Sequence, residues 1–266
     1  MRYFIAILAL ITMTPAAQAD GGFSVEDMRG ADVVFLGEVH DNPDHHMRQA
    51  DIVAQLQPRG IVWEMLTGVR ASAVTPEMLG AEAVLGPFLY WEENGWPDFS
   101  MYYPIFAAAP DAQHFGAALP REEARRVMGA PVAEVFGTNA ALFGLDRDLP
   151  ESQQQARESM QMSAHCDALP EEVLARMVDI QRLRDARIAA VIREAIVATG
   201  GPVAVITGNG HARKDWGAPE ALSRAMPDLT IYALGQGEDG RAPDGTFDAV
   251  ADAPAVERDD PCAAFQ

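Results

Sequence analysis

The chain has 266 residues, and its 39 aspartates and glutamates outnumber its 20 lysines and arginines, which gives a formal net charge of −19. A surface this acidic repels phosphate backbones and anionic lipid headgroups, so the composition argues against a nucleic-acid-binding or membrane-surface protein. The length is sufficient for one sizeable domain with its own hydrophobic core.

The first residues have the layout of an export signal. A short basic start precedes an apolar run over residues 4–13, and Ala17-Gln18-Ala19 follows. This pattern is typical of a cleavable signal peptide over residues 1–19, although a buried or interfacial helix is the alternative. The run is shorter than the about 20 residues that a membrane span needs. We therefore expect a periplasmic or secreted protein, with residues 20–266 as a single domain and no membrane span after cleavage.

Short apolar segments alternate with segments of helical pattern along the chain. Strands are predicted over residues 31–37, 60–65, 113–118, 202–207 and 229–234. Helices are predicted over residues 42–57, 121–128, 170–199 and 219–225. The repeated order of strand, helix and strand implies parallel pairing and right-handed crossovers. The expected fold class is α/β, with three layers and a mostly parallel central sheet.

Two long segments interrupt this alternation. Residues 67–110 are rich in Trp, Tyr, Phe and Pro, and residues 129–169 are mostly helical in propensity. We predict that both segments are helical insertions on one side of the sheet. The tail after Gly235 is rich in Asp, Gly, Pro and Ala, and we expect it to be irregular and loosely packed.

The chain contains two cysteines, Cys166 and Cys262. In an oxidising compartment such a pair more often forms a disulfide than a metal site or a nucleophile. We predict a Cys166–Cys262 disulfide that ties the C-terminal tail to the middle of the chain. Two unpaired buried thiols are the alternative.

Chemically versatile side chains follow three of the predicted strands. Gly37-Glu38-Val39-His40 comes after the first strand, Glu64 ends the second, and Gly208-Asn209-Gly210-His211 follows the fourth. In a parallel sheet the carboxyl ends of the strands share one edge, and ligands bind there in open α/β folds. We therefore expect His40, Glu64 and His211 along the same edge.

Several chemistries are compatible with two imidazoles and one carboxylate. His40, Glu64 and His211 could hold a divalent metal such as zinc with an open position for water. The same groups could act without a metal, with a histidine as general base, or could line a cofactor pocket. In a purely structural role, each histidine would cap a turn and Glu64 would pair with an arginine.

These motifs resemble those of the ChaN-like haem-binding family, which belongs to a wider group with the Tiki proteases and erythromycin-esterase-like proteins. Residues 35–42 (FLGEVHDN), Glu64-Met65 and residues 206–211 (ITGNGH) look like its signature. Residues 181–189 (QRLRDARIA) resemble its Q-x-x-R-D-x-x-M-A helix, and residues 215–219 (DWGAP) resemble its D-x-G-V-P segment. The resemblance extends over about residues 31–235.

Two positions depart from the family pattern. Ile188 stands where the helix motif usually has Met, and residues 118–121 (ALPR) have Ala where the family often has Asn. Any polar contact that this Asn makes at the edge of the site is absent here, so we expect the chemistry of the site to differ from that of the family.

The resemblance implies haem binding in haem or iron uptake or trafficking, with a haem-transport system as a further partner. The kinship to proteases and esterases leaves a metal-dependent hydrolase as the alternative. The catalytic residues of that hydrolase would be Glu38, His40, Glu64 and His211.

Haem needs an aromatic-lined apolar slot and an axial donor such as His, Tyr or Met. The two insertions supply candidate slot residues and donors: Trp91, Trp96, Phe99, Tyr102, Tyr103, Phe106, Met160, Met162 and His165. We rank Tyr102 and Tyr103 first as iron ligands, followed by His165 and then by His40 and His211. Cofactor contacts are also expected from Asn209, Arg184 and Asp185. Arg184 and Asp185 would either form a salt bridge or orient a carboxylate of the site.

Overall fold

The computed structural model describes residues 23–260, 262 and 263, so the predicted signal peptide lies outside the described part of the chain. Six strands form one sheet in the order β3-β2-β4-β1-β5-β6, and all five pairings are parallel. The strands are β1 (Val33–Glu38), β2 (Gly60–Trp63), β3 (Gln113–Gly116), β4 (Val203–Gly208), β5 (Ile231–Glu238) and β6 (Ala249–Ala253). The fold is α/β, as predicted.

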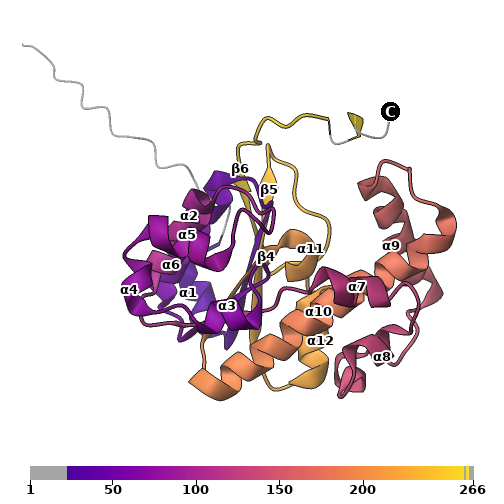
Figure 1. Cartoon of the computed structure of the whole chain (residues 1–266), viewed down its shortest axis with the longest axis horizontal. Helices are drawn as coiled ribbons and strands as arrows, with labels where there is room; N and C mark the ends of the chain where they lie inside the picture. Colours follow the sequence, from indigo (N-terminus) through magenta and orange to yellow (C-terminus); the bar gives the residue numbers. More distant parts are fainter. Residues whose placement is uncertain (1–22, 261, 264–266) are drawn as a thin grey trace, which may run out of the picture.

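Helices cover both faces of the sheet (Figure 1). On one face lie α1 (Val25–Met28), α2 (Pro43–Leu56), α3 (Gly68–Ser72), α4 (Pro76–Leu79), α5 (Glu82–Leu89) and α6 (Phe99–Ala108). On the other lie α7 (Arg121–Arg126), α8 (Val132–Phe136), the 3₁₀ helix η1 (Ala140–Phe143), α10 (Glu171–Thr199) and α12 (Ala218–Ala225). Helix α9 (Glu151–Ala164) packs on α10, and the short α11 (Asn209–Ala212) follows β4 directly.

The central strand β1 explains the three layers. Val34 and Leu36 belong to the core beneath α2 and α6, whereas Val33 and Phe35 belong to the core beneath α10 and α12. Since successive side chains of a strand point to opposite faces, a strand covered on both faces must be apolar throughout. The uninterrupted apolar pattern of this segment therefore follows from its central position.

Local signals set the bounds of the helices next to the site. Asn42 caps α2, since its side chain accepts a hydrogen bond from the backbone N–H of Asp44, and Pro43 occupies the first turn. The 29-residue helix α10 ends at Gly200, which has a positive φ of 76°. Glycine adopts this left-handed conformation without steric cost, which makes it a common helix terminator.

The two insertions are helical, as predicted, but they do not lie on one side of the sheet. The segment over residues 67–110 packs on the face with α2, and the segment over residues 129–169 lies on the face with α10. The crossover after each strand selects the face, and sequence patterning alone does not reveal that selection.

The C-terminal tail also differs from the prediction of an irregular segment. Strand β5 continues to Glu238, and Ala249–Ala253 forms the sixth strand parallel to it. Ala251 and Ala253 are buried while Asp252 is exposed, which is the alternation of an ordinary strand. Because the buried side chains are alanines, the apolar signal in the sequence is too weak to distinguish this strand from a loop.

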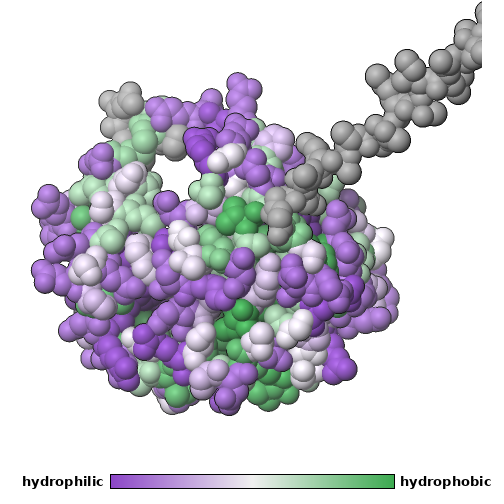
Figure 2. All heavy atoms as spheres, turned by 180° about the vertical axis from the view of Figure 1, so that it is seen from behind, coloured by the Kyte–Doolittle hydropathy of each residue, from purple (hydrophilic) through white to green (hydrophobic). Residues whose placement is uncertain are grey.

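The tail continues from β6 toward the end of α9 (Figure 1). There Cys262 and Cys166 form the predicted disulfide, with an S–S distance of 2.01 Å. Seen from behind, the surface is mostly hydrophilic, with hydrophobic atoms confined to separate patches (Figure 2). Within the described residues, no helix is both long and apolar enough to span a membrane.

Candidate functional site

Three neighbouring strands of the sheet end beside one another and bring the predicted residues together. Because the order is β2-β4-β1, Glu64 after β2, His211 in α11 after β4, and Glu38 and His40 at the end of β1 share one edge. Asp185 reaches this edge from α10 and hydrogen-bonds His211. We call these five residues the rim cluster. The expectation that His40, Glu64 and His211 meet at one edge is confirmed.

Glu64 lies between the two imidazoles. Its Oε1 is 3.7 Å from His211 Nε2 and 4.0 Å from His40 Nε2. Its Oε2 accepts hydrogen bonds from Thr207 Oγ1 at 2.6 Å and from the Gly208 backbone N–H at 2.8 Å. Burial by itself raises the pKa of Glu64, but the charges of His211 and His40 and these two hydrogen bonds outweigh it and lower the pKa to about 2. Glu64 is therefore a carboxylate at neutral pH.

His40 is held from the opposite side by Glu38. His40 Nδ1 donates to Glu38 Oε1 over 2.7 Å, and the fully buried Glu38 side chain also accepts hydrogen bonds from Tyr102 and Gln49, each 2.7 Å long. Burial opposes protonation of His40, yet the hydrogen bond to Glu38 and the charges of Glu38 and Glu64 raise its pKa to about 9. The imidazole is therefore cationic at neutral pH and has a fixed orientation.

His211 has the corresponding arrangement with Asp185. His211 Nδ1 donates to Asp185 Oδ1 over 2.6 Å, and its Nε2 faces Glu64. Burial opposes protonation of His211, but the charges of Glu64 and Asp185 and the hydrogen bond to Asp185 outweigh it and raise the pKa. Each rim imidazole is thus oriented by a carboxylate at Nδ1 and presents Nε2 to the shared edge. Imidazoles that ligate metals are commonly oriented in this way.

Sequence reasoning missed a layer of buried polar residues on α2. Gln49 donates to Glu38 Oε2 and to the Leu36 carbonyl, and His46 Nε2 donates to the His40 carbonyl at 2.9 Å. Both side chains are fully buried. They lie one turn apart on the inward face of α2, where apolar residues are the norm. The signal that could have identified His46 and Gln49 is their position on the otherwise apolar face of this predicted helix.

Tyr102 is part of this inner layer rather than of the exposed edge. Its side chain is fully buried, and its hydroxyl donates to Glu38 Oε1 at 2.7 Å and to the His40 carbonyl at 3.1 Å. Burial and the neighbouring Glu38 charge raise the pKa of Tyr102 well above its ordinary value. This arrangement disfavours Tyr102 as a phenolate ligand of iron and indicates that it positions Glu38.

Four other predicted contact residues lie outside the rim cluster. Tyr103 donates to the Leu79 carbonyl, and His165 caps the end of α9, with Nδ1 donating to the Gln161 carbonyl. The cofactor contacts predicted for Tyr103, His165, Asn209 and Arg184 stay predictions.

Asn209 and Arg184 also have local partners. Asn209 joins the turn after β4 to β5, since it donates to the Gln236 carbonyl at 2.8 Å and accepts from the Gln236 N–H at 2.9 Å. Gly37 faces this amide, and a Cβ there would lie 2.5 Å from Asn209 Oδ1, so the close approach requires glycine. Arg184 bonds Gln181 rather than Asp185.

The predicted zinc site receives no support. Among residues 23–260, 262 and 263, no group of three or more His, Cys, Asp or Glu side chains is arranged so that it could hold a metal ion. In the rim cluster, both imidazoles face Glu64 Oε1 as ion-pair partners.

Residues 24–222 match the sequence profile of a family described as haem-binding uptake, Tiki superfamily, ChaN. The chain belongs to this family. The matched range covers most of the chain and contains the whole rim cluster. The resemblance inferred from the motifs is therefore confirmed. No protein with curated annotation matches the chain significantly.

A solved structure of this family has the same fold. It is that of ChaN from Campylobacter jejuni, described as showing cofacial heme binding, with a TM-score of 0.62 and 20% sequence identity over 80% of this chain and 84% of that one. The type III effector HopBA1 gives a TM-score of 0.46 at 14% identity, over 87% of this chain and 92% of that one. A Bacillus cereus protein gives 0.46 at 13% identity, over 90% and 76%.

Proposed function

We propose that this protein binds haem at the edge where β1, β2 and β4 end, and that it serves haem or iron uptake or trafficking outside the cytoplasm. The observation that carries the proposal is the family match over residues 24–222, which includes all five residues of the rim cluster. The likeness in fold to a ChaN protein whose structure is described by its heme binding supports it further.

The donors of the rim cluster fit this ligand. Bound haem supplies an iron centre that takes an axial nitrogen, oxygen or sulfur donor. The His40 side chain is 34% exposed, compared with 11% for His211, so His40 is the more accessible imidazole. The Trp96 ring lies beside it, with 5.2 Å between the ring centroids, and supplies the aromatic surface that a porphyrin needs. We therefore propose His40 as the axial donor. It would give up its Nε2 proton on binding iron, because only a neutral imidazole ligates a metal and metal binding releases protons.

An exported location agrees with the covalent structure. The Cys166–Cys262 disulfide is of a kind that persists in oxidising compartments and is rare in the cytosol. Together with the signal-like pattern of residues 1–19, it supports a periplasmic or secreted location.

The hydrolase alternative has weaker support. A general base must be neutral at the working pH, but the pKa of His40 is raised to about 9 and that of His211 is raised as well. The described residues also offer no metal-binding cluster that could activate a water molecule.

Titration of the purified protein with hemin, followed by absorbance, tests the proposal. We expect a Soret band shifted from that of free hemin, with an end point at a stoichiometric ratio. Ester and peptide substrates should be turned over no faster than in buffer. A titration that leaves the Soret band of hemin unshifted at stoichiometric hemin would overturn the proposed function.

A further inference from the structure

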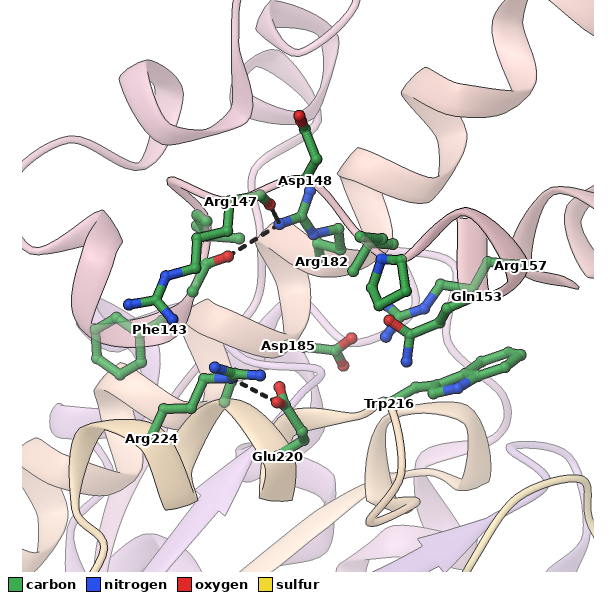
Figure 3. A pocket seen from close by; sticks show the side chains of 15 residues that line it. Phe143, Arg147, Asp148, Gln153, Arg157, Arg182, Asp185, Trp216, Glu220 and Arg224 are labelled. Atoms are coloured by element: carbon green, nitrogen blue, oxygen red, sulfur yellow. Dashed lines mark hydrogen bonds and ion pairs between the residues drawn. The ribbon is translucent and has the colours of Figure 1, made fainter. Parts of the chain in front are cut away.

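A cavity of about 360 Å³ adjoins the rim cluster on the α10 side of the sheet. Its lining comes from η1 and the loop after it, from α9, α10 and α12, and from Trp216 between α11 and α12. Asp185 belongs both to this lining and to the rim cluster, so the cavity lies directly behind His211. Figure 3 shows Asp185 between two groups of side chains, with Arg157, Gln153 and Trp216 on one side and Arg147 and Arg224 on the other.

Three of the four arginines that line the cavity have acceptors within the protein. Arg182 donates to Asp179 Oδ1 at 3.2 Å and to two backbone carbonyls. Arg224 is paired with Glu220 on the same helix. Arg147 is largely exposed, with Asp146 3.8 Å away. These guanidinium groups are neutralised or hydrated without a ligand.

Arg157 is the exception. Arg157 is only 7% exposed, and its Nε is buried without a hydrogen-bond partner. Its guanidinium forms no hydrogen bond or ion pair with any other part of the described chain; it lies over the Trp216 ring, 5.0 Å from the centroid. No hydrogen bond or ion pair joins Arg157 to the neighbouring Asp185, whose Oδ1 is bonded to His211.

A guanidinium group in this position requires an acceptor. It carries five N–H donors, and burial leaves the Nε–H without water or a protein acceptor. Buried polar groups in native proteins almost always have a partner, so an unpartnered one indicates a missing ligand or water. A carboxylate is the complementary group, because its two oxygens match two parallel N–H donors of the planar fork.

We propose that this cavity binds a carboxylate, held by the Arg157 guanidinium through two parallel hydrogen bonds beside Gln153 and Trp216. Two sources have this chemistry. One is a propionate of a haem that is bound at the adjoining rim cluster, and this source rests on the proposed function. The other is a free small carboxylic acid. Asp185 lines the cavity and also belongs to the rim cluster, so the cavity lies next to the proposed haem site. This proximity favours the propionate.

Hemin and its dimethyl ester separate the two sources. The ester keeps the ring and the iron but lacks free carboxylates. If a propionate occupies the cavity, Arg157→Gln weakens hemin binding about tenfold or more and leaves ester binding unchanged. Arg147→Gln removes the same charge from an exposed position of the same cavity and serves as the matched control, with no effect on either ligand.

Thermal unfolding with succinate, in the absence of hemin, tests the other source. A free carboxylic acid in the cavity raises the Tm of the wild type and of Arg147→Gln but not that of Arg157→Gln. If Arg157→Gln does not fold, Arg157→Lys takes its place, because lysine keeps the charge and lacks the planar fork. Equal weakening of hemin and ester, together with no response of the wild-type Tm to succinate, overturns the inference. Failure of the wild type to bind hemin overturns the proposed function instead, and the succinate measurement then decides about the cavity.

Discussion

Each rim imidazole lies between two carboxylates. His40 is placed between Glu38 and Glu64, and His211 between Asp185 and Glu64. An opposite charge at this distance favours the protonated imidazole, and burial strengthens the attraction while it also removes hydration. The net effect is a pair of oriented histidines with raised pKa values on either side of the Glu64 carboxylate.

The influence of Glu38 on His40 can be measured directly. Glu38→Gln keeps the shape of the side chain and removes its charge, so the pKa of His40 should fall from about 9 toward the ordinary value of 6.5. Titration of the His40 ring by NMR gives this value. Glu26→Gln, which breaks the exposed ion pair with Arg29, is the control and should leave it unchanged. A His40 pKa that stays near 9 in Glu38→Gln would contradict this account.

His114 provides a second test at the residue scale. It is buried, its Nδ1 accepts a hydrogen bond from Trp63 Nε1 at 3.0 Å, and burial lowers its pKa to about 4. Since the folded pKa lies below the unfolded value of 6.5, the neutral ring favours folding. Its contribution is complete above pH 6.5 and is lost as the pH falls toward 4.

The loss should reach about 3 kcal/mol at pH 4. Urea unfolding at pH 7 and pH 4 measures it as the difference between the wild type and His114→Gln, in which the titrating ring is absent. Effects of the other titrating groups cancel in this comparison. An equal decrease in both proteins would exclude His114 as the cause.

At the scale of elements, the site depends on how strands end. The sequence predicts that His40, Glu64 and His211 follow strands, and the common edge of a parallel sheet then brings them together. Their actual contact requires the order β2-β4-β1, in which β4 lies between two strands that precede it by more than 130 residues. That order is set by the crossovers, which local patterns do not specify.

The same limit applies to the rest of the fold. All five predicted strands are present. The segments of β1, β2 and β4 are buried throughout, whereas the edge strand β3 is only partly buried. Strand β6 was missed because its buried side chains are alanines. The position of Tyr102 beneath the rim could not be predicted either, because spacing along a helix does not reveal which buried carboxylate a hydroxyl will reach.

The turn after β4 is held by Asn209, and this contact can be tested. Asn209→Ala leaves the N–H and C=O of Gln236 without their side-chain partner. Unmade hydrogen bonds of this kind cost about 1–3 kcal/mol, so the free energy of unfolding should decrease by about that amount. Urea denaturation measures it. Asn94→Ala, in an exposed helix-end contact, is the control and should have little effect. Equal stabilities of the two variants would rule out the clamp.

At the scale of the whole molecule, the C-terminal tail connects the two sides of the site. Arg258 in the tail pairs with Asp41 and Glu238, and the Pro254 carbonyl accepts a hydrogen bond from Asn42. Beyond these contacts Cys262 is bonded to Cys166 at the end of α9. The tail therefore links the start of α2, next to His40, with the helix that carries Arg157.

Loss of this link should destabilise the fold. The disulfide joins residues 96 positions apart, and a cross-link that closes a long loop raises the free energy of unfolding by about 2–4 kcal/mol. The double variant Cys166→Ser/Cys262→Ser should be less stable by that amount in chemical denaturation, and a reductant should lower the stability of the wild type alone. Equal stability of the variant and the oxidised wild type would contradict this role.

The central claim, that haem binds where β1, β2 and β4 end, is tested most directly by hemin titration of His40→Ala beside the wild type. We expect hemin to bind the variant about tenfold or more weakly, with an altered Soret band that added free imidazole restores. Wild type and His40→Ala with the same Soret band and the same dissociation constant would contradict the claim.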